Sequence, residues 1–394
     1  MSDNELRDEI AHLPAPLRAK LDSAGFDAER LIALARPLRA RARGEAAKGR
    51  DERNRVGGVV EPPRPEDIVE APAPGSPDSA RLAASGLEAV RNRKIAFCVL
   101  AGGMATRMGG VVKAMVEALD GHTFLDLRLR ENATWSERAG SPVPLWLMTS
   151  EATDVPIRDE LARRGAGPHV ATFAQDIGLR LTPDGHLLRD DDGSPSTYAT
   201  GHGDLPDALQ RSGLLSDFVA RGGEFVWIAN LDNLGASLDA ALLGWFAERR
   251  ADLMVEVAPK AAGDRGGIPV WADARDRRGQ VVRRLQVLEE FRLPEGFDAA
   301  RVRVFNTNTF LVRTEALLRA QVPWSWCEVE KKVGDRVAVQ FERLLQELTG
   351  AMSAVYVRVP REGAVSRFLP VKDYQELASR RDDIRAVAVA RGMI

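Results

Sequence analysis

The sequence contains few of the residues and segments that define several protein classes. Its 394 residues include only two cysteines, Cys98 and Cys327, and five histidines. Two cysteines this far apart do not predict a disulfide framework or a zinc cluster. No apolar run reaches the ~18 residues of a membrane span, and the charged first residues lack the apolar stretch of a signal peptide. We therefore expect a cytoplasmic protein with no membrane partner.

A large excess of one charge is also absent, because the formal net charge is −2. This balance argues against a nucleic-acid partner that is recognised through bulk charge. Apolar residues make up 44% and charged residues 28% of the chain, as in an ordinary globular enzyme. The length is enough for two or three domains.

Composition divides the chain into four regions. Residues 1–57 are rich in Ala, Leu, Arg and Glu, and predict a helical N-terminal region of two or three amphipathic helices. Residues 58–78 contain many prolines and acids, and predict a linker or an extended arm. We expect residues 79–374 to form the main domain and residues 375–394 to form a C-terminal helix.

Short apolar segments alternate with longer periodic segments through the main domain. The predicted strands are residues 95–100, 144–149, 170–173, 225–228, 253–257, 302–312 and 354–359. The predicted helices are residues 79–93, 113–119, 155–164, 204–212, 215–221, 237–250, 315–321, 338–349 and 373–391. This alternation predicts an α/β fold with a doubly wound, mostly parallel sheet.

The most informative segment is a glycine-rich loop directly after the first predicted strand. The run from Leu100 through Ala101, Gly102 and Gly103 continues to Arg107. Glycines let a backbone approach an anion closely, and a following helix N-terminus would add positive charge. The loop matches neither of the two commonest nucleotide-binding motifs. It therefore predicts a phosphate site of another type, and a glycine-rich turn without a ligand is the alternative.

Three other polar clusters follow predicted strands, where open α/β sheets bind ligands. Gln175 offers a donor and an acceptor that could read a base edge. Gly201 could lie against a flat base, and His202 could contact phosphate. Asn230 and Asp232 could hold Mg²⁺ and a sugar. The alternatives are a helix N-cap with an exposed histidine and a plain Asn/Asp turn.

Lysines and buried amides add candidates that are weak alone. Asn306 and Asn308 interrupt an apolar strand, where sugar hydroxyls or a satisfied core network could pair them. Lys113 and Lys372 could neutralise phosphate, and a solvated lysine is the alternative for each.

Taken in order, these segments resemble the eukaryotic-type UTP–glucose-1-phosphate uridylyltransferases and the related UDP-N-acetylhexosamine pyrophosphorylases. The resemblance runs from about residue 94 to residue 374. Its motifs are Leu-x-Gly-Gly-x-x-Thr-x-Met-Gly at 100–109, Pro-Leu-x-x-Met-x-Ser at 144–150, Phe-x-Gln at 173–175, Gly-His-Gly-Asp at 201–204, Asn-x-Asp-Asn-Leu-Gly-Ala at 230–236, Lys260 with Gly266-Gly267, Glu289, Phe-Asn-Thr-Asn at 305–308, Val-Gln-x-Glu at 339–342 and Arg-Phe-Leu-Pro-Val-Lys at 367–372.

The resemblance implies a Rossmann-like nucleotidyltransferase fold with a mixed, mostly parallel sheet, and it implies a role for each motif. The loop of Leu100, Ala101, Gly102 and Gly103 would cradle the UTP phosphates, with Arg107 and Lys113 as catalytic cations. Gln175 and Gly201 would read uracil, and His202 would contact the α-phosphate region. Asp232 would bind Mg²⁺, and Lys372 would neutralise the transferring phosphate. The ribose or glucose would contact Asn230, Gly267, Glu289, Asn306 and Asn308.

We therefore expect UDP-glucose and pyrophosphate to form from UTP and glucose 1-phosphate. The alternatives are a pyrophosphorylase for galactose or N-acetylglucosamine 1-phosphate, and a homologue that binds ligand without turnover. Val112-Lys113-Ala114 replaces the family's Pro-Lys-Ser, and Arg107 is shared with the hexosamine branch. The C-terminal β-helix domain of the glucose branch is not found after Lys372, so we expect a monomer, with a dimer through the N-terminal helices as the alternative.

Overall fold

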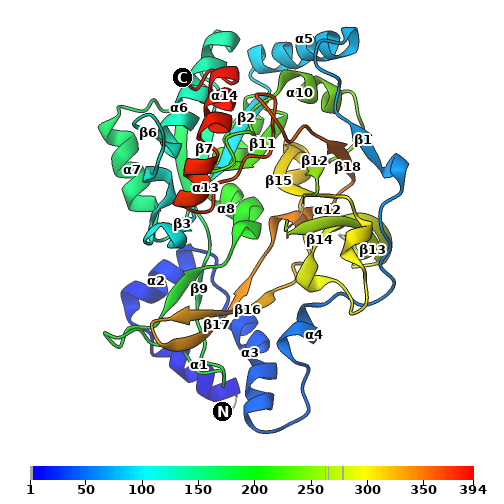
Figure 1. Cartoon of the computed structure of the whole chain (residues 1–394). Helices are drawn as coiled ribbons and strands as arrows, with labels where there is room; N and C mark the ends of the chain where they lie inside the picture. Colours follow the sequence, from blue (N-terminus) through cyan, green and yellow to red (C-terminus); the bar gives the residue numbers. More distant parts are fainter. Residues whose placement is uncertain (1–2, 262, 265, 277–278) are drawn as a thin grey trace.

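A computed structural model describes residues 3–261, 263–264, 266–276 and 279–394. Its centre is an eight-stranded sheet (Figure 1). In spatial order the strands are β1 (Ile68–Glu70), β18 (Ala354–Arg358), β12 (Leu253–Pro259), β15 (Val304–Arg313), β11 (Phe225–Asn230), β2 (Ile95–Leu100), β7 (Leu145–Thr149) and β8 (Val170–Ala174). Within the described residues, no helix is both long and apolar enough to cross a membrane.

The sheet is mixed and mostly parallel, as the sequence predicts. Strand β15 alone among the eight runs antiparallel to its neighbours, β12 and β11. Its first residues therefore lie at the edge where the parallel strands end, since Val257 near the end of β12 pairs with Asn306 near the start of β15. This reversal brings the asparagines of β15 to the carboxyl edge of the sheet.

Helices cover both faces of the sheet because buried side chains alternate along each strand. Phe97 and Trp227 belong to one core, whereas Cys98 and Ile228 belong to the core of the opposite face. The first face carries α5 (Pro77–Arg91), α6 (Phe124–Ala139), α7 (Asp154–Arg163), α10 (Ala240–Ala247) and α14 (Arg381–Ala390). The second face carries α8 (Leu205–Arg211), α9 (Leu214–Ala220), α11 (Thr314–Leu318), α12 (Leu348–Ala351) and the hairpin of β13 (Gly267–Arg275) and β14 (Val281–Glu289).

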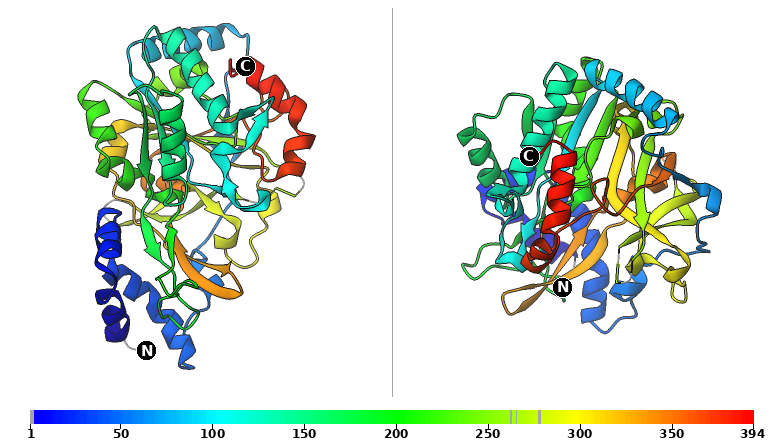
Figure 2. Two further views of the ribbon diagram at one scale, coloured as in Figure 1. Left: turned by 90° about the vertical axis from the view of Figure 1, so that its left-hand side faces the viewer. Right: turned by 45° about the horizontal axis from the view of Figure 1, so that its top comes forward.

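The N-terminal helices form a separate small core with two hairpins. Helices α1 (Asp3–Ala11), α2 (Ala15–Ser23) and α3 (Ala28–Ala42) pack on β9 (Ile177–Leu179) and β17 (Arg336–Glu342). Strand β9 pairs with β10 (Thr197–Ala199), and β17 pairs with β16 (Cys327–Val333). Figures 1 and 2 show these blue helices at the end of the molecule opposite α5 and α10.

The proline-rich arm crosses the surface between α4 (Arg50–Asn54) and α5. It is not wholly irregular, since β1 lies within it and extends the sheet by pairing in parallel with β18. The remaining elements are β3 (Met104–Ala105), β4 (Val111–Val112), β5 (Glu117–Leu119), β6 (His122–Thr123) and α13 (Tyr374–Ser379).

Three predicted helices are corrected by the structure. Residues 113–119 form a single 3-10 turn followed by β5, and residues 338–349 are mostly β17 and a short helix, α12. The predicted helix at 373–391 is two helices, α13 and α14. Helix α6 and the hairpins β13–β14 and β16–β17 were not predicted. The short strands β5 and β6 are joined by Asp120-Gly121, both at positive φ, which is a hairpin signal in the sequence.

Candidate active site

The glycine-rich loop leaves the centre of the sheet at the end of β2. Within this loop, the two-residue strands β3 and β4 pair antiparallel as a short hairpin. No α-helix begins between this loop and α6, so the expected helix N-terminus beside the phosphates is wrong for the described residues. Ala101 donates its backbone N–H to Met148 (2.8 Å), and the Leu100 carbonyl accepts from Leu231. The backbone N–H groups of Gly102 and Gly103 donate to no acceptor among the described residues, so they are available to an anion.

Two candidate cations behave differently in this loop. Arg107 is exposed, and its guanidinium forms no hydrogen bond with the described residues. Lys113 forms an ion pair with Asp232, and both side chains are 17% exposed. The lysine of the phosphate loop and the proposed metal ligand therefore contact each other directly. Each neutralises the other until a phosphate or a cation competes for the contact.

Gln175 lies directly beside the glycine-rich loop. It follows β8, is 8% exposed, and its backbone N–H donates to the Thr149 carbonyl (2.9 Å). A Cβ on Gly102 would lie 3.1 Å from the Gln175 side-chain oxygen, so a side chain there would crowd the amide. Ser150 closes the group by donating from Oγ to the Gly102 carbonyl (2.8 Å). The structure therefore brings the predicted base reader and phosphate loop together.

The loop of Gly201 and His202 is held against Arg343. Gly201 has φ of +106°, and a Cβ there would lie 2.6 Å from the Arg343 carbonyl oxygen, so glycine is required. One face of Gly201 is thus covered by protein backbone. His202 Nδ1 accepts from the Leu345 backbone N–H (2.8 Å), and burial lowers the pKa of the imidazole to about 4. The neutral ring consequently carries its proton on Nε2, where it can donate to an anion.

Arg343 is a central residue that the sequence reasoning missed. Its guanidinium donates to Asp204 (2.8 Å), Asp176 (2.7 Å) and Asp207 (2.5 Å). Asp204 also accepts from Thr200 Oγ1 and from the Asp176 backbone N–H. This buried network ties the segment after β8, the Gly-His-Gly-Asp loop and the end of β17. A lone arginine after an apolar strand gives no signal for such a role.

A second group of predicted residues gathers around the start of β15. Asn308 donates from Nδ2 to Asn230 Oδ1 (2.9 Å), and its backbone N–H donates to Asn306 Oδ1 (3.1 Å). Asn308 has φ of +57°, in the left-handed region that asparagine tolerates. Its side-chain oxygen is buried and has no partner among the described residues. Three of the predicted sugar ligands are therefore brought together.

Gly267 and Glu289 lie next to this group, opposite each other in the β13–β14 hairpin. A Cβ on Gly267 would lie 3.1 Å from Glu289 Oε1, which accepts from Gln346 Nε2 (2.6 Å). Burial and the neighbouring Glu290 raise the pKa of Glu289 to about 7, against the opposing charge of Arg292. Gln346, whose own side-chain oxygen is buried and has no partner in the part of the chain that the structure describes, was also missed.

Lys372 is the candidate whose surroundings are most open. Its side chain is exposed and forms no hydrogen bond with the described residues of the glycine-rich loop. Burial raises the pKa of Asp264, but hydrogen bonding from Arg361 and the charges of Arg361 and Lys372 lower it overall. Asn233 fastens the segment before Lys372, since it donates to the Arg367 carbonyl and accepts from the Leu369 N–H. The loop that carries Asp232 is thereby connected to the segment that carries Lys372.

Asp232 fits a magnesium ion that is completed by substrate. Among the described residues no group of three or more His, Cys, Asp and Glu side chains could enclose a metal. Mg²⁺ is often held by one or two carboxylates together with substrate phosphates and water. One carboxylate beside a phosphate loop suits that mode.

Comparison with known proteins identifies this arrangement. The family model described as UTP–glucose-1-phosphate uridylyltransferase matches residues 60–388. The chain belongs to this family. It is 31% identical to a UTP–glucose-1-phosphate uridylyltransferase of Saccharomyces cerevisiae, over 81% of this chain and 65% of that protein. Across several curated relatives of the uridylyltransferase family, the chain spans between 57% and 74% of their length.

Solved structures support the fold of the uridylyltransferase family. A UDP-glucose pyrophosphorylase V402W mutant from Leishmania major matches with a TM-score of 0.70 and 23% identity, covering 95% of this chain and 82% of that chain. A UDP-N-acetylglucosamine pyrophosphorylase from Trypanosoma brucei matches with a TM-score of 0.71 and 20% identity, covering 99% and 84%. These two likenesses establish the fold and do not distinguish between the two sugars.

Proposed function

We propose that this chain transfers a uridylyl group from UTP to glucose 1-phosphate, giving UDP-glucose and pyrophosphate. The observation that carries the proposal is the convergence of family motifs at one edge of the sheet. Gln175 lies beside Gly102, Lys113 pairs with Asp232, and Asn308 donates a hydrogen bond to Asn230. These contacts join segments that are far apart in the sequence.

In the proposed reaction, a phosphate oxygen of glucose 1-phosphate attacks the α-phosphorus of UTP in line. The bond from the α-phosphorus to the bridging oxygen breaks, and pyrophosphate leaves. Such a transfer depends on positioning of the substrates and on neutralisation of charge more than on covalent catalysis by the protein. Arg107, Lys113 and Lys372 would supply positive charge, and His202 would donate from Nε2. A magnesium ion held by Asp232 and the substrate phosphates would neutralise further charge on the triphosphate.

The base and the sugar would be held on opposite sides of this centre. Gln175 would pair with the N3–H and a carbonyl of uracil. The unpartnered oxygen of Asn308 would accept a hydroxyl hydrogen bond, and Asn306, Gly267 and Glu289 border the same space. These hydroxyl-binding groups support a sugar 1-phosphate as the second substrate.

The test is pyrophosphate release from UTP with a panel of sugar 1-phosphates. We expect glucose 1-phosphate to give the highest kcat/KM. If galactose 1-phosphate or N-acetylglucosamine 1-phosphate gives a higher kcat/KM, that sugar 1-phosphate becomes the proposed substrate in place of glucose 1-phosphate. The similarity to the UDP-N-acetylglucosamine pyrophosphorylase structure is compatible with this outcome. UTP binding without turnover on any sugar would identify a binding homologue.

We also propose that the chain is a monomer. The apolar faces of α1 to α3 are buried within the chain against β9 and β17, which removes the need for a second copy to cover them. Light scattering after size exclusion should give a mass near 43.0 kDa. A mass near twice that value would contradict the proposal.

A further inference from the structure

Asp232 is presented by a buried loop that has no helix or strand of its own. The Asp232 loop, residues 230–239, runs from the last residue of β11 to the residue before α10. Within residues 231–238, every residue is buried except Asp232 itself. Buried carbonyls outside regular structure need hydrogen-bond donors from elsewhere in the protein, because an unpaired one is costly. The position of Asp232 therefore depends on the groups that supply those donors.

A single guanidinium, that of Arg128 on α6, donates to four carbonyls of this loop. Its Nη2 donates to the carbonyls of Asn230 (2.9 Å) and Asn233 (2.5 Å). Its Nη1 donates to the carbonyl of Ala236 (3.1 Å), and its Nε donates to that of Leu231 (3.4 Å). Because these carbonyls converge on one side chain, the path of the loop is fixed from inside the protein.

Arg128 is too deeply buried to contact a substrate. Its side chain is 0% exposed and forms an ion pair (2.7 Å) with Glu131, which is also 0% exposed. The guanidinium lies over the ring of Phe97, 5.5 Å from its centre. Glu131 also accepts from the Leu238 N–H (3.3 Å), so the pair holds both the start and the end of the loop. Any effect of Arg128 on a reaction must therefore pass through the Asp232 loop.

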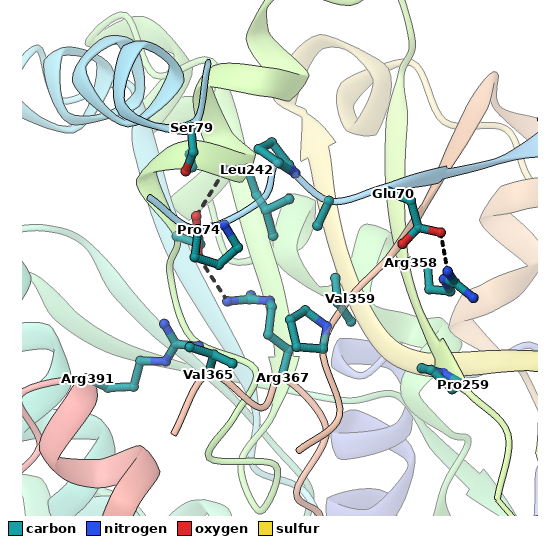
Figure 3. Close-up of a pocket in the computed structure, with 15 residues that line it drawn as sticks. Glu70, Pro74, Ser79, Leu242, Pro259, Arg358, Val359, Val365, Arg367 and Arg391 are labelled. Carbon is teal, nitrogen blue, oxygen red and sulfur yellow. Dashed lines mark hydrogen bonds and ion pairs between the residues drawn. The ribbon is translucent and has the colours of Figure 1, made fainter. Parts of the chain in front are cut away.

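The Asp232 loop is also fastened to the segment that carries Lys372. Arg367, which precedes Lys372 in that segment, donates from Nη2 to the Ser237 carbonyl (2.7 Å). Figure 3 shows the Arg367 side chain extending from the segment after β18 toward α10, whose N-cap Asp239 lies 3.6 Å from Nη1 of Arg367. Asn233 adds the hydrogen bonds to the same segment described above. Movement of the loop would consequently move both candidate site residues.

Arg313 shows the same arrangement at a place remote from the candidate site. It donates to the carbonyls of Ala247 (3.3 Å), Arg249 (2.6 Å) and Ala251 (3.0 Å), at and after the end of α10. Arg313 ends β15 and pairs with Phe225 at the start of β11, so it lies at the opposite edge of the sheet from the Asp232 loop. It is therefore a matched control for the loss of a guanidinium that gathers backbone carbonyls.

We propose that Arg128, together with Glu131, is a positioning residue that sets the place of Asp232 against the substrate phosphates. The inference rests on the proposed function, because it takes Asp232 as the magnesium ligand of the uridylyl transfer. Loss of a side chain that orients a metal ligand typically lowers metal affinity or turnover by about 10-fold to 100-fold. Gln175 and Gly102 would still hold UTP, so kcat should fall more than the KM for UTP rises.

Two variants test the proposal by pyrophosphate release. Arg128→Lys keeps a positive charge beside Glu131, but an ammonium group does not reach the four carbonyls. Arg128→Met combined with Glu131→Gln removes both buried charges together and keeps an acceptor for the Leu238 N–H. We expect each to lower kcat by about 10-fold to 100-fold and to change the KM for UTP by less than about threefold. Arg313→Lys should keep the kcat of the wild type.

A second measurement does not require turnover. Titration of the full chain with Mn²⁺ in the presence of UTP, without a sugar 1-phosphate, gives the Kd for the cation from the electron paramagnetic resonance signal of free Mn²⁺. We expect this Kd to rise by about 10-fold or more in both Arg128 variants. It should stay unchanged in Arg313→Lys. The Tm of each variant checks its fold, and either folded Arg128 variant is sufficient for the comparison.

The outcomes separate this inference from the proposed function. Wild-type kcat and Mn²⁺ affinity in a folded Arg128 variant would overturn the inference and leave the proposed function intact. Equal losses in Arg313→Lys would also overturn it, because they would show a general effect of disturbed packing. If the wild type releases no pyrophosphate with any sugar 1-phosphate, the proposed function is contradicted, and the Mn²⁺ titration still decides whether Arg128 positions Asp232.

Discussion

The two sides of the candidate active site differ in how their polar groups are satisfied. On the nucleotide side, Arg343 binds Asp176 and Asp204, and His202 accepts from the backbone. On the proposed sugar side, the side-chain oxygens of Asn308 and Gln346 are buried without partners among the described residues. Buried polar groups are normally paired, so free ones mark a place for ligand hydroxyls. The proposed nucleotide side is therefore held in place by the protein itself, whereas we expect the proposed sugar side to gain hydrogen-bond partners from its ligand.

The largest effect is expected at Asp232, where the phosphate loop and the sugar side meet. We expect Asp232→Asn to lower turnover by on the order of 10³-fold or more, because an amide does not balance the charge of a divalent cation. Initial rates of pyrophosphate release measure the change, with Asp217→Asn on α9 as the matched control. Near-normal activity in the folded variant would remove Asp232 from the metal site.

The proposed nucleotide side should depend on Arg343 for stability. Arg343→Met leaves Asp204 buried without its cation and leaves Asp176 with Arg211 alone, which we expect to cost about 3–5 kcal/mol of unfolding free energy. Asn308→Gly on the sugar side keeps the positive φ and removes one side-chain hydrogen bond, at about 1 kcal/mol. Urea unfolding compares the two. Equal decreases in unfolding free energy in the two variants would contradict the proposed difference between the nucleotide side and the sugar side.

Lys372 should act on the reaction more than on binding. We expect Lys372→Ala to lower kcat by about 10²-fold and to change the KM for UTP far less, because charge at the transferring phosphate develops in the transition state. Steady-state kinetics with Lys331→Ala as an exposed control measures both constants. An unchanged kcat would make Lys372 an ordinary solvated lysine.

The raised pKa of Glu289 predicts a pH effect on the sugar side. The folded pKa is about 7 against an ordinary value of 4.5. The unfolded chain releases this proton first, so stability is lost as pH rises from about 4.5 to about 7. Between these pH values, the unfolding free energy of Glu289→Gln should decrease by about 2–3 kcal/mol less than that of the wild type. Unfolding at pH 5 and pH 8 measures it, and Glu295→Gln, an exposed control, should behave as wild type.

The smallest effect is expected at Gln175, on uracil recognition. Gln175→Ala should narrow the gap between UTP and CTP by roughly 1–3 kcal/mol in transition-state discrimination, because it removes a paired donor and acceptor. The ratio of the two kcat/KM values measures it. Unchanged discrimination would place base recognition in another residue.

Prediction succeeded where structure is local. Strand β2 begins and ends as predicted at residues 95–100, because an apolar run of this length that ends in glycines favours a buried strand. The glycines after it and Gln175 after β8 were proposed as ligand contacts because ligands meet open sheets at strand ends, and the structure places them side by side. It failed at 338–349, where alternating burial in β17 was read as helical spacing, and at 113–119, where Asp120-Gly121 was overlooked.

The sequence by itself determined the family, most strands of the central sheet and the identity of the candidate ligands, because motifs and periodicity are properties of neighbouring residues. Tertiary structure alone decided which of these groups meet. Antiparallel β15 brings Asn308 to Asn230, and Arg343 joins two acids from other segments. Such contacts depend on the path of the chain through space, which no local pattern records.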